Sequence, residues 1–162
     1  MQNYTDYDAV GLAELVAKKE VSPEELLTSA LERAEEAKAE LNCVSALFPE
    51  IARAQIEAGL PDGPLSGVPF MTKDLGVAVK GAPLTGGSRL FKDNIAFHNS
   101  TLVERYMKAG ILLMGQTTSP EYGLTTSTES ALFGQTRNPW NLERTSGGSS
   151  GGASAAVASG GL

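Results

Sequence analysis

The sequence predicts an α/β fold in which helices pack around a mixed, partly parallel sheet. Two observations lead to this prediction. Stretches with helical spacing of apolar residues alternate with short apolar runs, and proline, glycine and serine mark the boundaries between them. With 162 residues, 41% of them hydrophobic, the chain can bury a core of ordinary domain size. We expect residues 1–162 to form part of one domain without an internal boundary.

The first third of the chain predicts two helices. Residues 6–18 carry apolar side chains at helical spacing, namely Ala9, Leu12, Leu15 and Val16. A second helix begins after Ser22, because Ser22 is a suitable N-cap, Pro23 fits the first helical position and Glu25 completes a capping box. Its apolar face continues to residue 34, with glutamates on the solvent side.

The strands are expected at short apolar runs. These are residues 43–48, residues 68–72 with Lys73 at their end, and residues 111–115, which suit a buried parallel strand. Helices are expected at residues 49–59, at residues 101–110 with Leu102, Val103, Tyr106 and Met107 facing inward, and from Ser150 onward. Residues 82–100 and 125–144 are expected to be irregular, with one capped turn after Ser119 between them.

Composition excludes several classes of function. The net charge of -6 does not favour binding to nucleic acid or to an anionic membrane. One cysteine and one histidine exclude an internal disulfide and a cysteine-based zinc cluster, and no dense carboxylate cluster suggests a metal site. The N-terminus lacks a signal pattern and no apolar run reaches membrane length. The sequence therefore predicts a soluble, cytoplasmic protein without metal.

The most distinctive segment is Gly147 to Gly152, in which four glycines surround the pair Ser149-Ser150. Glycine permits positive φ and lets another group approach the main chain closely. Composition also allows a flexible linker, because 15 of the 18 residues from 145 to 162 are Gly, Ser or Ala. The segment formally fits the nucleophile elbow Gly-x-Ser-x-Gly, although His98 lies upstream, and it lacks the lysine of a phosphate-binding loop. The motif alone leaves linker and catalytic loop open.

Three segments together point to a known family. They are GVPFMTKD at residues 67–74, GQTTSPE at residues 115–121 continuing to FGQTRNPWN at residues 133–141, and RTSGGSSGG at residues 144–152. Their order and spacing closely resemble the N-terminal part of the amidase signature family. The resemblance covers nearly the whole chain, since that family also opens with helices like those expected at residues 6–39. Residues 1–162 are accordingly expected to be the N-terminal portion of a single amidase signature domain.

The resemblance implies a Ser-Ser-Lys triad that acts on amide bonds. The family's lysine falls on Lys73 and its middle serine on Ser149, held by a cis peptide bond after Gly148. Ser150 would support the loop through hydrogen bonds. The family's acyl-accepting serine follows in a Gly-Gly-Ser-[Ile/Val]-Arg segment that also supplies the oxyanion hole, and residues 1–162 contain no such segment after Ser150. We therefore expect this polypeptide to be inactive by itself.

Chemistry gives a reason for each of these residue types. A serine hydroxyl becomes a strong nucleophile when a neighbouring base takes its proton, and lysine is a base only when neutral. The pKa of Lys73 must therefore fall through desolvation, which the apolar run before it can supply. A carboxylate nearby would favour the charged form, so we expect Asp74 to point away from the lysine amine.

Other residues have weaker assignments. By the resemblance, the hydroxyl residues Thr125, Thr126, Ser127 and Thr128 line the substrate pocket, with a polar surface loop as the alternative. Trp140 is expected to pack beside the turn at Asn138-Pro139, Cys43 to be a small core residue and His98 to lie in a solvated loop.

The resemblance implies an amidase that hydrolyses a carboxylic amide through a serine acyl-enzyme, without cofactor. The expected partners are a small-molecule amide and either the remainder of an amidase chain or a second copy of this one. Two alternatives stay open. One is the glutaminase subunit of a tRNA-dependent amidotransferase, and the other is a non-catalytic fragment used in binding or assembly.

Overall fold

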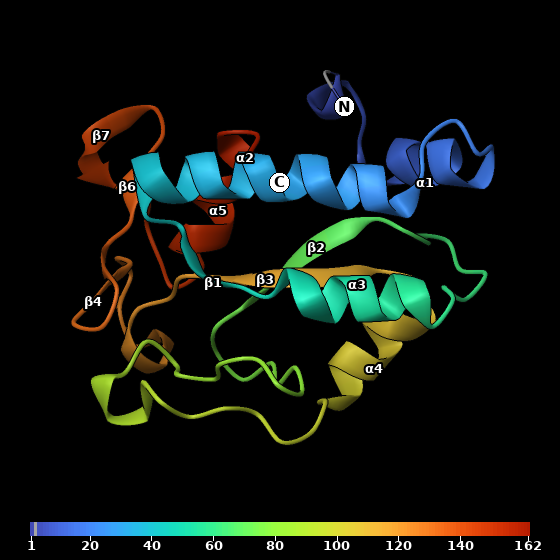
Figure 1. Cartoon of the computed structure of the whole chain (residues 1–162). Coiled ribbons are helices and arrows are strands. Elements are labelled where there is room, and N and C mark those ends of the chain that lie inside the picture. The colour runs from blue at the N-terminus through green and yellow to red at the C-terminus, as the bar shows by residue number, and fades with distance from the viewer. Residues whose placement is uncertain (2) are drawn as a thin grey trace.

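The structure, a computed structural model, describes residue 1 and residues 3–162 (Figure 1). The helices are α1 (Ala9–Ala17), α2 (Pro23–Leu41), α3 (Pro49–Glu57), α4 (Thr101–Lys108) and α5 (Gly151–Ala158), with 3-10 turns η1 (Tyr4–Asp6), η2 (Arg89–Phe91) and η3 (Glu121–Gly123). The strands are β1 (Val44–Leu47), β2 (Pro69–Lys73), β3 (Leu112–Thr117), β4 (Glu129–Ser130), β5 (Gly134–Gln135), β6 (Arg137–Asn138) and β7 (Asn141–Thr145).

The central sheet has the order β1-β3-β2. β1 runs antiparallel to β3 and β2 runs parallel to it, so the expected mixed, partly parallel sheet is confirmed. β1 pairs only with the later part of β3. Beside the first part, the Gln55 side chain of α3 takes the place of a strand: it donates to Ile111 O and accepts from Leu113 N, each at 2.9 Å. The backbone groups of a buried strand need such partners.

Helices cover both faces of this sheet. In Figure 1, α1, α2 and α5 lie on one side, while α3, α4 and the long loop after β2 lie on the other. The first layer buries a core that includes Leu26, Met71, Leu112, Met114 and Ala155. The second layer buries Phe48, Val79, Val103, Ile111 and Leu113. β3 contributes to both cores because its successive side chains point to opposite faces.

The local signals for helix starts are confirmed. Ser22 and Glu25 form the capping box of α2, with Glu25 N donating to Ser22 Oγ at 3.2 Å and Ser22 N donating to Glu25 Oε2 at 2.8 Å. In α4 the expectation for Leu102 is wrong, because that side chain is 43% exposed and Val103 occupies the core. The helix is short, and only a narrow stripe of it meets the rest of the protein.

Residues 125–144, expected to be irregular, contain two small antiparallel ribbons, β4–β5 and β6–β7. β4, β5 and β6 have two residues each, too few to show an alternation of apolar and polar residues. All five residues of β7 are exposed, so no buried apolar face marks that strand in the sequence. Within residue 1 and residues 3–162, no helix has both the length and the apolar character needed to cross a membrane.

Candidate active site

Lys73 is placed by the parallel pairing of β2 with β3. It stands opposite Thr117 in the ladder, and Asp74 N extends the pairing by donating to Thr117 O at 3.1 Å. The strand residues before it are largely buried, and the Lys73 side chain is itself half-buried. Burial lowers the pKa of Lys73 below its ordinary value, because an ammonium group loses hydration there.

The amine of Lys73 meets the serine pair. It donates to Ser149 Oγ at 2.8 Å and to Ser150 Oγ at 3.0 Å, across 76 and 77 positions of sequence. The peptide bond between Gly148 and Ser149 is cis. Ser150 directly precedes α5, so the glycine-rich segment is an ordered loop that leads into a helix. The residues expected at the catalytic centre are thus brought together.

Thr128 holds both ends of the serine loop, defined as residues 147–151, a role that sequence reasoning missed. Its side chain is buried, and its hydroxyl donates to Gly147 O at 2.8 Å and accepts from Gly151 N at 3.1 Å. One hydroxyl therefore binds the backbone on either side of the serine pair. The only signal was a run of hydroxyl residues at 125–128, which does not show which of them faces inward.

The four glycines serve two different purposes. Gly147 has φ +81°, a backbone conformation that residues other than glycine rarely adopt. The others permit close approach. A Cβ on Gly148 would lie 2.9 Å from Ser127 N, and one on Gly152 would lie 2.5 Å from Thr118 N. The loop is therefore pressed against residues 118 and 126–128.

Thr125 and Thr126 lie beside the loop rather than within it. Both are exposed, and the Thr125 hydroxyl donates to Ser127 O at 2.8 Å. Backbone atoms of Thr126 and Ser127 form the surface against which Gly148 packs. Their role in binding a substrate stays a prediction.

Asp74 points away from Lys73, toward the loop that follows β2. Its carboxylate accepts hydrogen bonds from Thr85 N at 2.8 Å, from the Thr85 hydroxyl and from Gly86 N at 3.4 Å. Among the described residues, no ion pair joins Asp74 to a cation. The lysine amine therefore faces hydroxyl groups, and the carboxylate faces a separate turn.

The remaining singled-out residues lie outside this centre. Cys43 is fully buried, and burial raises the pKa of its thiol to about 11, as expected of a core residue. His98 is exposed in the loop before α4, with its ring 4.6 Å from that of Phe97. The expectation for Trp140 is wrong: its side chain is 85% exposed. The turn itself is held by Asn138 Oδ1, which accepts from Trp140 N at 2.9 Å, and needs no packing of the indole.

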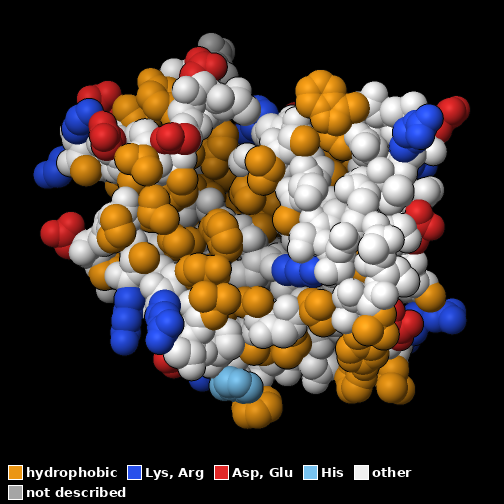
Figure 2. Space-filling view, turned by 180° about the vertical axis from the view of Figure 1, so that it is seen from behind, with side chains coloured by type: hydrophobic (Ala, Val, Ile, Leu, Met, Phe, Trp, Pro, Cys, Tyr) orange, Lys and Arg blue, Asp and Glu red, His pale blue; other side chains and the backbone are white. Residues whose placement is uncertain are grey.

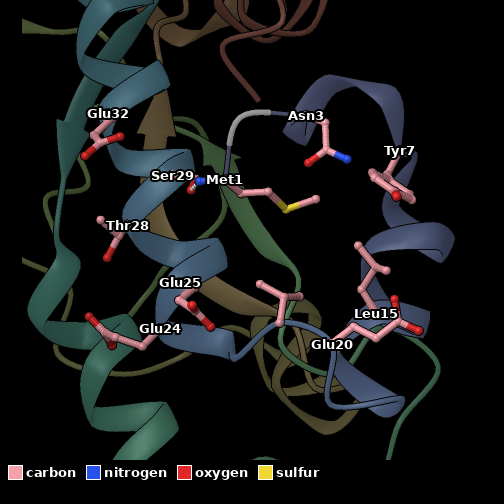
Figure 3. Close-up of a pocket in the computed structure, with 11 residues that line it drawn as sticks. Met1, Asn3, Tyr7, Leu15, Glu20, Glu24, Glu25, Thr28, Ser29 and Glu32 are labelled. Carbon is pink, nitrogen blue, oxygen red and sulfur yellow. Dashed lines mark hydrogen bonds between the residues drawn. The ribbon is translucent and has the colours of Figure 1, made fainter.

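Two hollows on the surface are separate from the lysine and the serines. One, of about 530 Å³, lies between the N-terminal segment and α2, where Glu24, Glu25 and Glu32 line it (Figure 3). The other, of about 690 Å³, lies between α1, the start of β2 and the end of α5. Hydrophobic side chains gather over a large part of the face shown in Figure 2. Neither hollow is lined by Lys73, Ser149 or Ser150, which meet where the end of β2 contacts the loop before α5.

Known proteins share this arrangement of segments. The chain is 41% identical over 153 residues to the 6-aminohexanoate-cyclic-dimer hydrolase of Paenarthrobacter ureafaciens, and 42% identical over 150 residues to the A subunit of the glutamyl-tRNA(Gln) amidotransferase of Prochlorococcus marinus. The matches cover 93% and 88% of this chain but 31% of each relative. The structure of 6-aminohexanoate cyclic dimer hydrolase complexed with substrate superposes with a TM-score of 0.90 and 40% identity, covering 96% of this chain and 32% of that one.

The chain thus spans about a third of the length of the relatives it matches. The family model described as Amidase matches residues 25–162, a range that includes Lys73, the Asn138-Pro139 turn and the serine pair. On this match, the chain belongs to the amidase family.

Proposed function

We propose that Lys73 and Ser149 are catalytic residues of an amidase that hydrolyses a small carboxylic amide through a serine acyl-enzyme. One observation carries the proposal: the Lys73 amine, at the end of a buried strand, contacts the Ser149 and Ser150 hydroxyls at 2.8 and 3.0 Å. Gly148 and Ser150 shape the loop, and Thr125 and Thr126 line the approach to it. The relatives named as an amide hydrolase and an amidotransferase support this reaction class.

In the proposed mechanism, neutral Lys73 takes the proton of Ser149, which takes the proton of the attacking serine. The same two residues return a proton to the leaving nitrogen, so that it departs as a neutral amine or ammonia. Burial favours this sequence because it lowers the pKa of Lys73 and so raises the neutral fraction at a given pH. We propose that the attacking serine and the oxyanion hole come from polypeptide outside residues 1–162, and that the protein acts in the cytoplasm.

The test compares two neighbouring serines. Hydrolysis of a panel of small amides is measured with the complete protein that carries these residues. We expect Ser149→Ala to lower kcat about 10³-fold or more, because the relay is lost. Ser150→Ala, the matched control in the same loop, should cost no more than about tenfold, because it removes a supporting contact. Equal losses in the two variants would contradict the assignment of Ser149 as the relay.

A second measurement tests the proposal that the attacking serine lies outside residues 1–162. Residues 1–162 are purified alone and assayed on the same amides, and no turnover is expected. Turnover by a homogeneous 162-residue preparation would show that the attacking group lies within these residues. In the complete protein, kcat/KM should rise with pH on an acid limb that ends below the ordinary lysine value of 10.5, because burial lowers the pKa of Lys73.

The glutaminase component of an amidotransferase is the second candidate, because the 42% identity to such a protein equals the identity to the hydrolase within one percentage point. It uses the same bond cleavage on a different amide donor. A glutaminase assay with and without partner subunits separates the two: release of ammonia from glutamine that depends on partner subunits would favour this candidate. A protein that binds a partner but hydrolyses no amide would favour an assembly role.

A further inference from the structure

Asp74 is a buried charged group that the mechanism above does not use. Its side chain is 1% exposed, and burial of a carboxylate is costly unless hydrogen bonds compensate it. Here the compensation comes from Thr85 and Gly86, whose backbone N–H groups and one hydroxyl donate to the carboxylate oxygens. The carboxylate therefore organises the turn at residues 85–87, which has no regular secondary structure to hold it.

From that turn, contacts lead to Ser149. Gly86 O accepts from Tyr122 N at 2.8 Å, and Tyr122 has φ +51°, which is rare for a bulky residue. The next residue, Gly123, has φ +68°, and a Cβ built on it would lie 3.4 Å from Ser149 Oγ. A left-handed pair held by Gly86 thus forms one wall of the position that Ser149 occupies.

A second set of contacts fixes the same region from the strand side. Asp74 O accepts from the Ser119 hydroxyl at 3.2 Å. Gly87 packs so closely on the backbone after β3 that a Cβ would lie 2.7 Å from Ser119 O. Asp74 therefore binds both the turn at 85–87 and the segment that leads from β3 into η3.

We propose that Asp74 is a positioning residue that, through the turn at 85–87 and the Tyr122-Gly123 wall, holds Ser149 at hydrogen-bonding distance from Lys73. It acts without touching the lysine amine, because side chains of adjacent residues at a strand end point to opposite faces. The catalytic consequence depends on the proposed function, whereas the positioning itself does not.

The charges around Lys73 are few enough for this effect to be measured. β3, α5 and the serine loop carry no ionisable side chain. η3 carries Glu121, which accepts from the Ser88 hydroxyl at 2.5 Å, and the phenol of Tyr122. α2 directs its carboxylates to solvent, and its half-buried Arg33 donates to Gly160 O at 2.5 Å. Asp74 is thus the buried carboxylate nearest to Lys73 in sequence.

The experiment is a direct titration of Lys73 by NMR, with ¹³C at Cε of lysine and the signal assigned through its loss in Lys73→Met. Asp74→Asn is expected to raise the pKa of Lys73, because a displaced Ser149 admits water to the amine. The alternatives have other signatures. If Asp74 acted only through its charge, its removal would lower the pKa of Lys73 further. If it merely stabilised the fold, Tm would fall with no change in the titration. Either result would overturn the proposal.

A matched pair of variants tests the turn without altering the charge. Thr85→Val removes the hydroxyl that donates to Asp74 and should raise the pKa of Lys73, whereas Thr85→Ser keeps the hydroxyl and should leave it unchanged. If Asp74→Asn fails to fold, this pair decides the question, and an unchanged titration in Thr85→Val refutes the proposal. Asp62→Asn, at an exposed turn, is the control for a generic change of charge.

Turnover gives an independent readout. In an active complete protein, Asp74→Asn should lower kcat by about tenfold to a hundredfold with little change in KM, because a misplaced relay slows chemistry more than binding. A complete protein that hydrolyses no amide but shows the expected titrations would refute the proposed function and leave the positioning role intact. A normal kcat with a shifted KM would contradict the positioning role alone.

Discussion

The two halves of the candidate site are held in different ways. Lys73 ends a strand that pairs residue by residue with β3, from Pro69 opposite Leu112 to Lys73 opposite Thr117. The serine loop has no such ladder around Ser149. Its two ends are bound by the hydroxyl of Thr128, its serines accept hydrogen bonds from the Lys73 amine, and its glycines allow close backbone contact.

The difference lies in how many contacts hold each part: many backbone hydrogen bonds hold β2, whereas a few individual atoms hold the serine loop. A ladder distributes its stability over many backbone hydrogen bonds, so a side-chain change at the end of β2 should leave the fold intact. The serine loop relies on a few contacts, so adding one methyl group or removing one hydroxyl there should measurably lower the free energy of unfolding. The following variants test that comparison.

The largest effect is expected for Lys73→Met in the complete protein. Activity should fall about 10³-fold or more, because the proposed general base is lost, while the free energy of unfolding should change by less than about 1 kcal/mol. Amide hydrolysis and denaturant unfolding measure the two quantities. A loss of several kcal/mol in stability would show that the strand end depends on the lysine after all.

Gly152→Ala should destabilise the protein by about 1–3 kcal/mol, because overpacking a close contact forces the backbone apart. The added Cβ would meet the backbone of Thr118 at 2.5 Å. Denaturant unfolding provides the measurement, with Ser154→Ala, exposed on the same helix, as a control that should be neutral or slightly stabilising. Equal stability of the two variants would mean that α5 shifts without cost.

Thr128→Val should cost about 1–2 kcal/mol, because Gly147 O and Gly151 N lose a buried partner while the side-chain shape is kept. Thr128→Ser retains the hydroxyl and should recover most of that loss. Unfolding free energies test the pair. If valine and serine behave alike, the hydroxyl does not hold the loop.

Gly147→Ala should cost about 1 kcal/mol, the penalty for a side chain in the left-handed region. Gly59→Ala is a matched control, since Gly59 has φ +86° and, like Gly147, no atom within 4 Å of an added Cβ. The two variants should lose similar stability, but only Gly147→Ala should disturb the Lys73 titration. A disturbed titration in both would indicate a global change.

The smallest expected effect is on the pH dependence of stability. Because burial lowers the pKa of Lys73, the folded state releases this proton at a lower pH than the unfolded state does. The wild type should therefore gain stability relative to Lys73→Met as pH rises toward 10.5, the ordinary lysine value. The raised pKa values of Tyr4 and Cys43 act in the opposite direction, but equally in both proteins, so they cancel in the difference.

Sequence signals that act over a few residues correctly predicted several helices and strands. The capping box at Ser22, the helices around it and the strand that ends at Lys73 were all predicted, because caps and apolar spacing operate locally. The ordered segments also predicted the family. The β4–β7 ribbons were not predicted, because β4, β5 and β6 have only two residues each and β7 is exposed along its whole length, so no periodic apolar pattern marks them. The exposure of Trp140 was not predicted either, because the turn beside it is held by the Asn138 side chain and not by packing of the indole.

By itself, the sequence determined which residue types were available and roughly where the five helices and the three strands of the central sheet would lie. Without the family resemblance, it leaves the glycine-rich segment open between a linker and a catalytic loop. Only the tertiary structure decided that Thr128 clamps the loop and that Asp74 binds the turn at Thr85. The physical reason is that these contacts join segments 19 and 11 positions apart through particular side-chain orientations, which depend on the packing of β2, β3 and α5.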